Sequence, residues 1–196
     1  MLFDELLEGK SLALTSEYSI KLITPDDLAD ILVMLENPKV TEFLFFAPAP
    51  EELYRAFFEP IIEDTQSAIA EGRWPEHPTV IISDKNGQYM GMGGLTQVML
   101  LEGNFEVGYQ LPEHAWHKGI ATEVCKTLTQ LAFSMLNAHK ISADCYGSNV
   151  GSYKTLEKCG FEQEGRAVNY YKFNNGFDDR LYYGLCLERY LTMPIK

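Results

Sequence analysis

The residues best suited to chemistry lie between His114 and Gly160. This segment carries five lysines, three acidic residues and three of the four histidines, in a chain whose net charge is −12. It is therefore the one part of the sequence with a positive balance. If the protein binds an anion, we expect the anion here, although a fluctuation of charge over so short a segment would look the same.

The loop from Trp116 to Thr122 has the features of a phosphate site. The first turn of a helix presents free backbone N–H groups, and the helix dipole adds partial positive charge there. Gly119 leaves room for a phosphate to approach, and Lys118 adds charge. The Gly-Lys-Ser/Thr ending of a nucleoside triphosphate loop is absent, as are the three glycines of a dinucleotide site. The loop predicts a different diphosphate ligand, or a glycine that only starts the helix.

The elements around this loop follow from hydrophobic spacing. Apolar residues spaced by three or four positions predict a long helix from Gly119 to about Asn137. A second helix is expected over Val150–Cys159, with Gly160 as its C-terminal cap. Strands are expected over Phe105–Leu111 and Lys140–Tyr146, so the centre reads strand, loop, helix, strand, helix.

The flanking segments predict a mixed α/β protein. A helix is expected to start at Thr24, and another to run from about Pro50 to Glu71, kinked or split by Pro60, with Leu53, Phe57 and Ile61 on one apolar face. Other expected elements are strands over Tyr18–Thr24, Thr79–Ser83 and Gln88–Leu101, and a last hairpin turning at Asn174-Asn175-Gly176. Within the third of these strands, Gly91–Gly94 predicts a bulge or a close backbone approach, because no helix follows.

Composition narrows the class of protein. The chain has 196 residues, 46% hydrophobic and 22% charged, which is typical of a single globular domain over 1–196. It has no apolar run that would span a membrane, and its four cysteines fit neither a zinc site nor a disulfide framework. We expect no signal peptide, because the first ten residues lack a basic region and a small-residue cleavage site. We expect a cytoplasmic protein. The negative charge argues against nucleic acid or membrane as partners.

Three ordered motifs resemble one enzyme superfamily. They are Glu106–Tyr109, Trp116–Glu123, and Asn149–Ser152 followed by Lys158–Phe161. Together they resemble the GNAT superfamily of acetyl-CoA-dependent N-acetyltransferases, and most closely its branch of ribosomal-protein N-terminal acetyltransferases. The resemblance covers roughly residues 79–185.

The resemblance implies a fold and a cosubstrate. The fold would be a mixed, mostly antiparallel sheet of about seven strands, splayed in the middle, with helices on both faces. Acetyl-CoA would lie between Phe105–Leu111 and Lys140–Tyr146. The backbone of Tyr109, Gln110 and Leu111 would pair with the pantetheine arm, with the Tyr109 N–H polarising the thioester. Backbone amides would hold the pyrophosphate, those of His117, Lys118, Gly119, Ile120, Ala121 and Thr122. Asn149 would bond the pantetheine or the substrate, besides capping its helix.

The resemblance also implies direct attack of a neutral amine on the thioester. The tyrosine that many members use to protonate the leaving thiolate is replaced by Leu156. Ser152 is the candidate in its place, with Tyr153 as an alternative. Glu106 or Asp144 would take the proton of the amine. No metal is expected.

The sequence does not identify the acceptor amine. The first half of the chain is acidic and rich in aromatic residues, and the last hairpin adds tyrosines, which together would favour a cationic amine. A protein N-terminal α-amine follows from the branch resemblance. The alternatives are a small amine, such as a polyamine, amino acid or antibiotic, and an acyl-CoA-binding domain without turnover. The last hairpin would also suit a homodimer.

Overall fold

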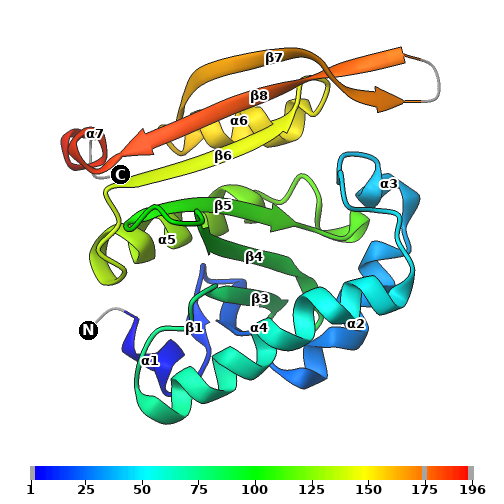
Figure 1. The fold of residues 1–196 in the computed structure, drawn as a ribbon. Coiled ribbons are helices and arrows are strands. Elements are labelled where there is room, and N and C mark those ends of the chain that lie inside the picture. The colour runs from blue at the N-terminus through cyan, green and yellow to red at the C-terminus, as the bar shows by residue number, and fades with distance from the viewer. Residues whose placement is uncertain (1–2, 174–175, 194–196) are drawn as a thin grey trace.

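Eight strands form one sheet in the computed structural model, which describes residues 3–173 and 176–193 (Figure 1). The strand order is β1-β2-β3-β4-β5-β6-β8-β7, and only the β5–β6 pair is parallel among these neighbours. The expected mixed, mostly antiparallel sheet is confirmed, and the two-residue β1 accounts for the eighth strand. The strands are β1 (Leu12–Ala13), β2 (Tyr18–Leu22), β3 (Thr79–Asp84), β4 (Tyr89–Gln97), β5 (Asn104–Gln110), β6 (Lys140–Tyr146), β7 (Glu162–Phe173) and β8 (Gly176–Cys186).

Helices cover both faces of the sheet, as expected. Val80 and Ile82 of β3 pack into the core that contains α5, whereas Ile81 packs into the core under α2 and α4. This alternation follows from the two-residue period of a strand. The helices are α1 (Asp4–Leu7), η1 (Pro25–Asp27), α2 (Leu28–Leu35), α3 (Pro38–Thr41), α4 (Glu51–Glu71), η2 (Glu113–Ala115), α5 (Ile120–Met135), α6 (Val150–Lys158) and α7 (Leu187–Thr192). None of these described helices is long and apolar enough to cross a membrane.

The sheet splits between β5 and β6. Their pairing begins at Asn104 opposite Lys140 and stops at Glu106 opposite Ser142. Beyond that point β5 continues to Gln110 and β6 to Tyr146 without pairing, and the two strands diverge (Figure 1). The predicted splay is therefore present, at the predicted pair of strands.

The long helix α4 differs from expectation in two ways. It runs unbroken through Pro60, whose ring lies on the exposed side, where water can satisfy the carbonyl that loses its partner. Its buried stripe is also shifted by one residue, to Tyr54, Phe58 and Ile62. Leu53 and Phe57 are 61% and 59% exposed, so the predicted face was wrong. Two adjacent apolar stripes with the same spacing compete here, and contact with α2 and the sheet decides between them.

Gly91 supports the end of β5 from the neighbouring strand. It has a φ of +126°, at the point where the register between β3 and β4 shifts. A Cβ atom on Gly91 would lie 2.5 Å from the carbonyl oxygen of Gln110 and 2.5 Å from a methyl carbon of Leu111. The predicted bulge and close backbone approach are both confirmed. The turn predicted at Asn174-Asn175 lies outside the described residues.

We predict that Gly91→Ala lowers the free energy of unfolding by roughly 2–4 kcal/mol, because backbone strain adds to the clash with the end of β5. The control is Gly87→Ala, which also has a positive φ of +81° but whose Cβ would meet nothing within 4 Å. It should cost only about 1 kcal/mol. Urea unfolding of both variants measures the difference, and equal losses would show that the close approach contributes nothing.

Candidate active site

The loop before α5 is shaped to bind an anion. His117 and Gly119 both have positive φ angles, +59° and +78°, which turn successive amides toward one side. In the described part of the chain, the N–H groups of residues 117–121 have no acceptor. The Thr122 N–H is different, because it donates to the Gly119 carbonyl at 3.1 Å. A Cβ on Gly119 would meet nothing within 4 Å, so the space in front of these amides is open.

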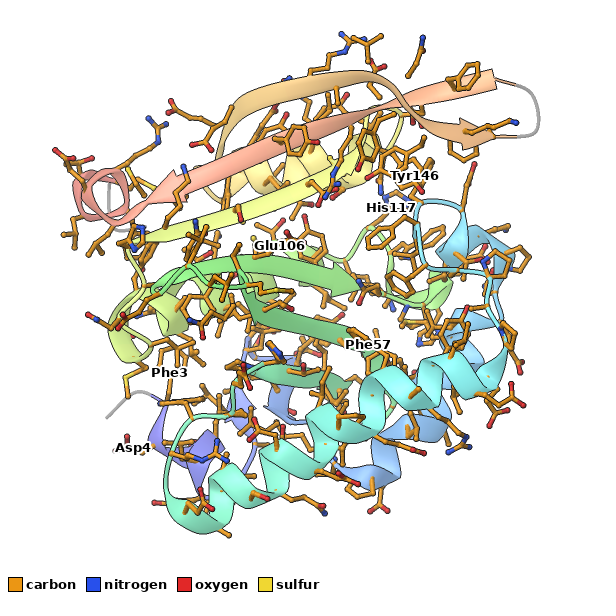
Figure 2. The ribbon with its side chains drawn as sticks, viewed as in Figure 1. Phe3, Asp4, Phe57, Glu106, His117 and Tyr146 are labelled. Atoms are coloured by element: carbon orange, nitrogen blue, oxygen red, sulfur yellow. The ribbon has the colours of Figure 1, made fainter. Side chains whose placement is uncertain are left out.

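Trp116 ties this loop to β5. Its indole N–H donates to the Leu111 carbonyl over 2.8 Å. The next residue, His117, lies at the wide end of the β5–β6 divergence, as does Tyr146 at the end of β6 (Figure 2). Trp116 therefore positions the loop against the end of β5. The sequence analysis named Trp116 as the first residue of the second motif but did not predict this role.

The diverging strands are bridged on the side of α5 and α6. The Tyr109 hydroxyl of β5 donates to the Ser152 carbonyl of α6 at 3.2 Å. Burial raises the pKa of Tyr109, so its hydroxyl stays protonated. Asn149 caps α6 by accepting from the Ser152 N–H at 3.1 Å, which confirms the capping role. Its side-chain NH₂ has no partner within the described residues and can still donate.

Residues of the divergence point to two opposite sides. Ala143 and Cys145 of β6 belong to the core that α5 and α6 cover. Asp144 and Tyr146 therefore point to the other side, as does Glu106, which stands opposite Ser142. No described helix packs over β5, β6 and β8 there, so we call it the open side (Figure 1). Ser152 lies on the helical side, and the candidate carboxylates lie on the open side.

Asp144 is held in a bidentate ion pair. Arg180 of β8 donates from Nε to Oδ2 at 2.7 Å and from Nη2 to Oδ1 at 2.8 Å. The Tyr171 hydroxyl donates to Oδ2 at 3.1 Å. The Asp144 carboxylate raises the pKa of Arg180, so the cation is permanent. The negative charge of Asp144 is thus compensated, and its oxygens are largely occupied.

Glu106 is the uncompensated carboxylate of the open side (Figure 2). No hydrogen bond or ion pair to its side chain occurs within the described residues. Surrounding protein raises its pKa, the nearby Asp144 charge raises it further, and Arg180 lowers it. A raised pKa makes a carboxylate a better proton acceptor near neutral pH.

Ser152 lies beside Cys145 on the helical side. Burial raises the pKa of the Cys145 thiol to about 11, and a hydrogen bond with the Ser152 side chain opposes this shift. Cys145 is therefore a neutral thiol at pH 7 and not an activated nucleophile. The Ser152 hydroxyl is the one non-aromatic O–H group that α6 brings to the divergence in its first turn.

An aromatic cluster borders the open side. The ring of Tyr146 stacks on Tyr171 with centroids 3.6 Å apart, and it contacts Phe173 at 5.6 Å and Phe43 at 5.8 Å. Phe43 comes from the segment after α3, so the first half of the chain reaches across to β6. This location agrees with the expectation that the first half and the last hairpin supply aromatic groups. Tyr54, Phe58 and Tyr183 are core residues instead.

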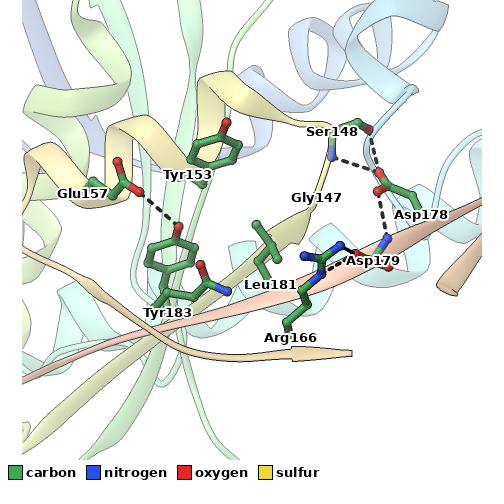
Figure 3. Close-up of a pocket in the computed structure, with 10 residues that line it drawn as sticks. Gly147, Ser148, Tyr153, Glu157, Arg166, Asp178, Asp179, Leu181 and Tyr183 are labelled. Atoms are coloured by element: carbon green, nitrogen blue, oxygen red, sulfur yellow. Dashed lines mark hydrogen bonds and ion pairs between the residues drawn. The ribbon is translucent and has the colours of Figure 1, made fainter. Parts of the chain in front are cut away.

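Two further hollows do not include the main candidate proton-transfer residues. One, of about 460 Å³, lies between α6, β7 and β8, and its lining includes Tyr153, Glu157 and Arg166 (Figure 3). There the Tyr183 hydroxyl donates to Glu157 at 3.3 Å, and Arg166 pairs with Asp179. The other, of about 890 Å³, lies between α2 and residues 112–114. Neither is lined by Glu106 or Ser152, and Tyr153, the alternative acid, faces the first of them.

A splayed parallel pair with an unpaired strand edge and an amide-lined helix start can hold an extended ligand that carries a phosphate, which is the arrangement expected of an acyltransferase that uses a coenzyme A thioester. A family model for the acetyltransferase (GNAT) domain matches residues 19–162, and the chain belongs to this family. It is an N-acetyltransferase, and its cosubstrate is acetyl-CoA.

Individual relatives cover most of the chain. The "Putative ribosomal N-acetyltransferase YdaF" of Bacillus subtilis is 28% identical over 172 residues, 85% of this chain and 90% of the relative. The spermidine N(1)-acetyltransferase of Vibrio cholerae is 24% identical over 169 residues, 85% of this chain and 91% of the relative. A crystal structure of Vibrio cholerae spermidine N-acetyltransferase with CoA and spermine matches with a TM-score of 0.77 at 19% identity, covering 91% of this chain and all of that one.

We predict that Lys118→Glu raises the dissociation constant for coenzyme A at least about tenfold, since it places a negative charge beside the amides of residues 117–121. The matched control is Lys126→Glu, further along α5, where the lysine pairs with Glu123 at 2.9 Å. Calorimetric titration measures both, and added salt should shrink the Lys118 effect. Unchanged affinity for the Lys118 variant would place the pyrophosphate elsewhere.

Proposed function

We propose that the protein transfers the acetyl group of acetyl-CoA to the N-terminal α-amine of a polypeptide. The observation that carries this proposal is the charge of the open side at the divergence. Of the two candidate carboxylates there, Glu106 has no ion pair within the described residues, whereas Asp144 is paired with Arg180. One negative charge matches one ammonium group. The relative whose name describes a ribosomal N-acetyltransferase supports the same acceptor class.

A polyamine is the second candidate acceptor. The Vibrio cholerae spermidine acetyltransferase is similar in sequence and fold, and the net charge of −12 would attract a polycation. However, an acceptor with three cations needs several free carboxylates, and three carboxylates around the divergence, Asp144, Asp179 and Glu113, are already paired with cations. Asp179 pairs with Arg166, and Glu113 pairs with Lys39 at 2.6 Å. The charge count therefore favours the α-amine.

The chain's cofactor-binding groups would act as follows. The amides of residues 117–121 would hold the pyrophosphate, and Lys118 would add positive charge. Thr122, whose own N–H donates to Gly119, would stand beside the pyrophosphate in the first turn of α5. The unpaired edge of Tyr109, Gln110 and Leu111 would bind the pantetheine arm as an added strand. The Asn149 NH₂ group would donate to the same arm. When bound, acetyl-CoA supplies the activated acetyl group as a thioester.

Two side chains would move protons on opposite sides of the sheet. Glu106, on the open side, would accept the proton from the amine, directly or through a water molecule. Ser152, on the helical side, would donate its hydroxyl proton to the leaving sulfur. Asp144 remains a candidate base by position, but its three hydrogen bonds favour a role in tuning Glu106.

The acceptor is tested by a panel with thiol release as the readout. We expect turnover with short peptides that carry a free N-terminus, and none with the same peptides acetylated at that end. Spermidine, amino acids and aminoglycosides should be poor acceptors. Preference for spermidine would contradict the proposal. Binding of acetyl-CoA without turnover on any amine would favour the non-catalytic alternative.

The proton-transfer roles predict distinct kinetic effects. Ser152→Ala and Glu106→Gln should each lower kcat about 10²-fold or more, within the range for loss of an acid or base group, while coenzyme A still binds. Because Glu106 must be ionised to accept a proton, kcat should fall as pH drops through its raised pKa. The acidic limb should vanish in Glu106→Gln and persist in Ser152→Ala.

Asp144→Asn tests the assignment of Glu106 as the base through the direction in which the acidic limb of kcat moves. The change removes the charge that raises the pKa of Glu106 and leaves the opposing Arg180 charge in place. The acidic limb of kcat should move to lower pH. Asp179→Asn, which removes a paired carboxylate from β8, should leave the limb in place. A limb that stays fixed in Asp144→Asn would exclude Glu106 as the titrating base.

A further inference from the structure

Arg180 is a fixed cation on the open side that proton transfer does not use. Besides its two hydrogen bonds to Asp144, it donates from Nη1 to the Tyr170 hydroxyl at 3.1 Å. The guanidinium carbon lies 5.1 Å from the ring centroid of Tyr170 and 5.2 Å from that of Tyr182. Ion pair, hydrogen bond and ring contacts together hold the charge in one place.

Arg180 still has donors to offer. A guanidinium carries five N–H bonds, and three are used by Asp144 and Tyr170. No further acceptor for it occurs in the described residues, and its side chain is 24% exposed. A bound molecule on the open side can therefore receive hydrogen bonds from it through an oxygen atom.

Its position matters for the charge of the acceptor. Glu106, Asp144 and Arg180 act on one another electrostatically and sum to a single negative charge. An amine at Glu106 would satisfy that charge. A second ammonium group near the first would meet the guanidinium, and juxtaposed like charges are costly where water is displaced.

We propose that Arg180 is the specificity-determining residue for the acceptor. It selects amines with one positive charge and an oxygen close to the amine, and it disfavours amines with a second cation a few carbon atoms away. An N-terminal residue fits, because its peptide carbonyl follows directly after the α-carbon. A polyamine does not, because three or four carbon atoms after the first amine comes another cation. This inference rests on the proposed function.

The test compares kcat/KM for a neutral short peptide with that for spermidine. Arg180→Gln should shift the ratio toward spermidine by at least about tenfold, mainly through KM, since a repulsion is lost and Asp144 becomes unpaired. Arg180→Lys keeps the charge, so spermidine should stay a poor acceptor, while KM for the peptide rises. Arg166→Gln is the matched control, because it breaks an Arg–Asp pair of the same hairpin at the hollow in Figure 3.

Two measures separate specificity from instability. The double variant Asp144→Asn/Arg180→Gln removes the carboxylate that Arg180→Gln alone would leave unpaired, and it should shift the ratio in the same direction, by less. Calorimetric titration of spermidine into the coenzyme A complex gives a readout without turnover, and Arg180→Gln should bind it about tenfold more tightly than wild type.

The outcomes distinguish the two proposals. If the wild type prefers the peptide and the neutral variants keep the wild-type ratio and spermidine affinity, the Arg180 assignment is wrong and the proposed function stands. If the wild type prefers spermidine, both are overturned. A shift toward spermidine only in the neutral variants, with Arg166→Gln unchanged, supports both.

Discussion

The structure depends on one interruption of hydrogen bonding, the point where β5 and β6 stop pairing. Before this point the strands pair, and the last paired residues are Glu106 and Ser142. Beyond it, the two strands separate, so the backbone groups of β5 that face β6 have no partner strand (Figure 1). Buried backbone groups are rarely left unpaired, and an extended ligand can take the place of the missing strand. The loop before α5, held to the end of β5 by Trp116, lies at the wide end of this divergence (Figure 2).

Strand alternation then divides the chemistry between two sides. Groups suited to coenzyme A, the amides of residues 117–121 and the first turn of α6, lie with the helices. Glu106 and the Asp144–Arg180 pair lie on the open side, bordered by the stacked rings of Tyr146 and Tyr171. The two substrates can thus approach from opposite faces and meet between the strands, which suits direct transfer without a covalent intermediate on the protein. The raised pKa of the Cys145 thiol agrees with that reading.

The sequence predicted the features that depend on local residue patterns. It missed those that depend on contacts between elements distant in the chain. Positive φ angles favour glycine, which is why the sequence marked the special backbone positions at Gly91, Gly119 and Gly160. The central strands and helices were predicted from the spacing of their apolar residues. The buried face of α4 could not be predicted, because the helix has two apolar stripes with the same spacing and only contact with the sheet determines which one is buried. Glu106 was found through the first motif, and Asp144 through its place on the strand expected to diverge from it. Arg180 was missed, because its place beside Asp144 requires the β6–β8 register, in which it stands opposite Tyr146.

The most direct test is a crystal structure with a bisubstrate analogue, a peptide whose N-terminal nitrogen is joined through an acetyl bridge to the sulfur of coenzyme A. We expect the bridge between β5 and β6, the pyrophosphate at residues 117–121, and the peptide on the open side, with its nitrogen near Glu106 and its first carbonyl toward Arg180. A peptide lying on the side of α5 and α6, or a pantetheine arm outside the divergence, would contradict the proposed site.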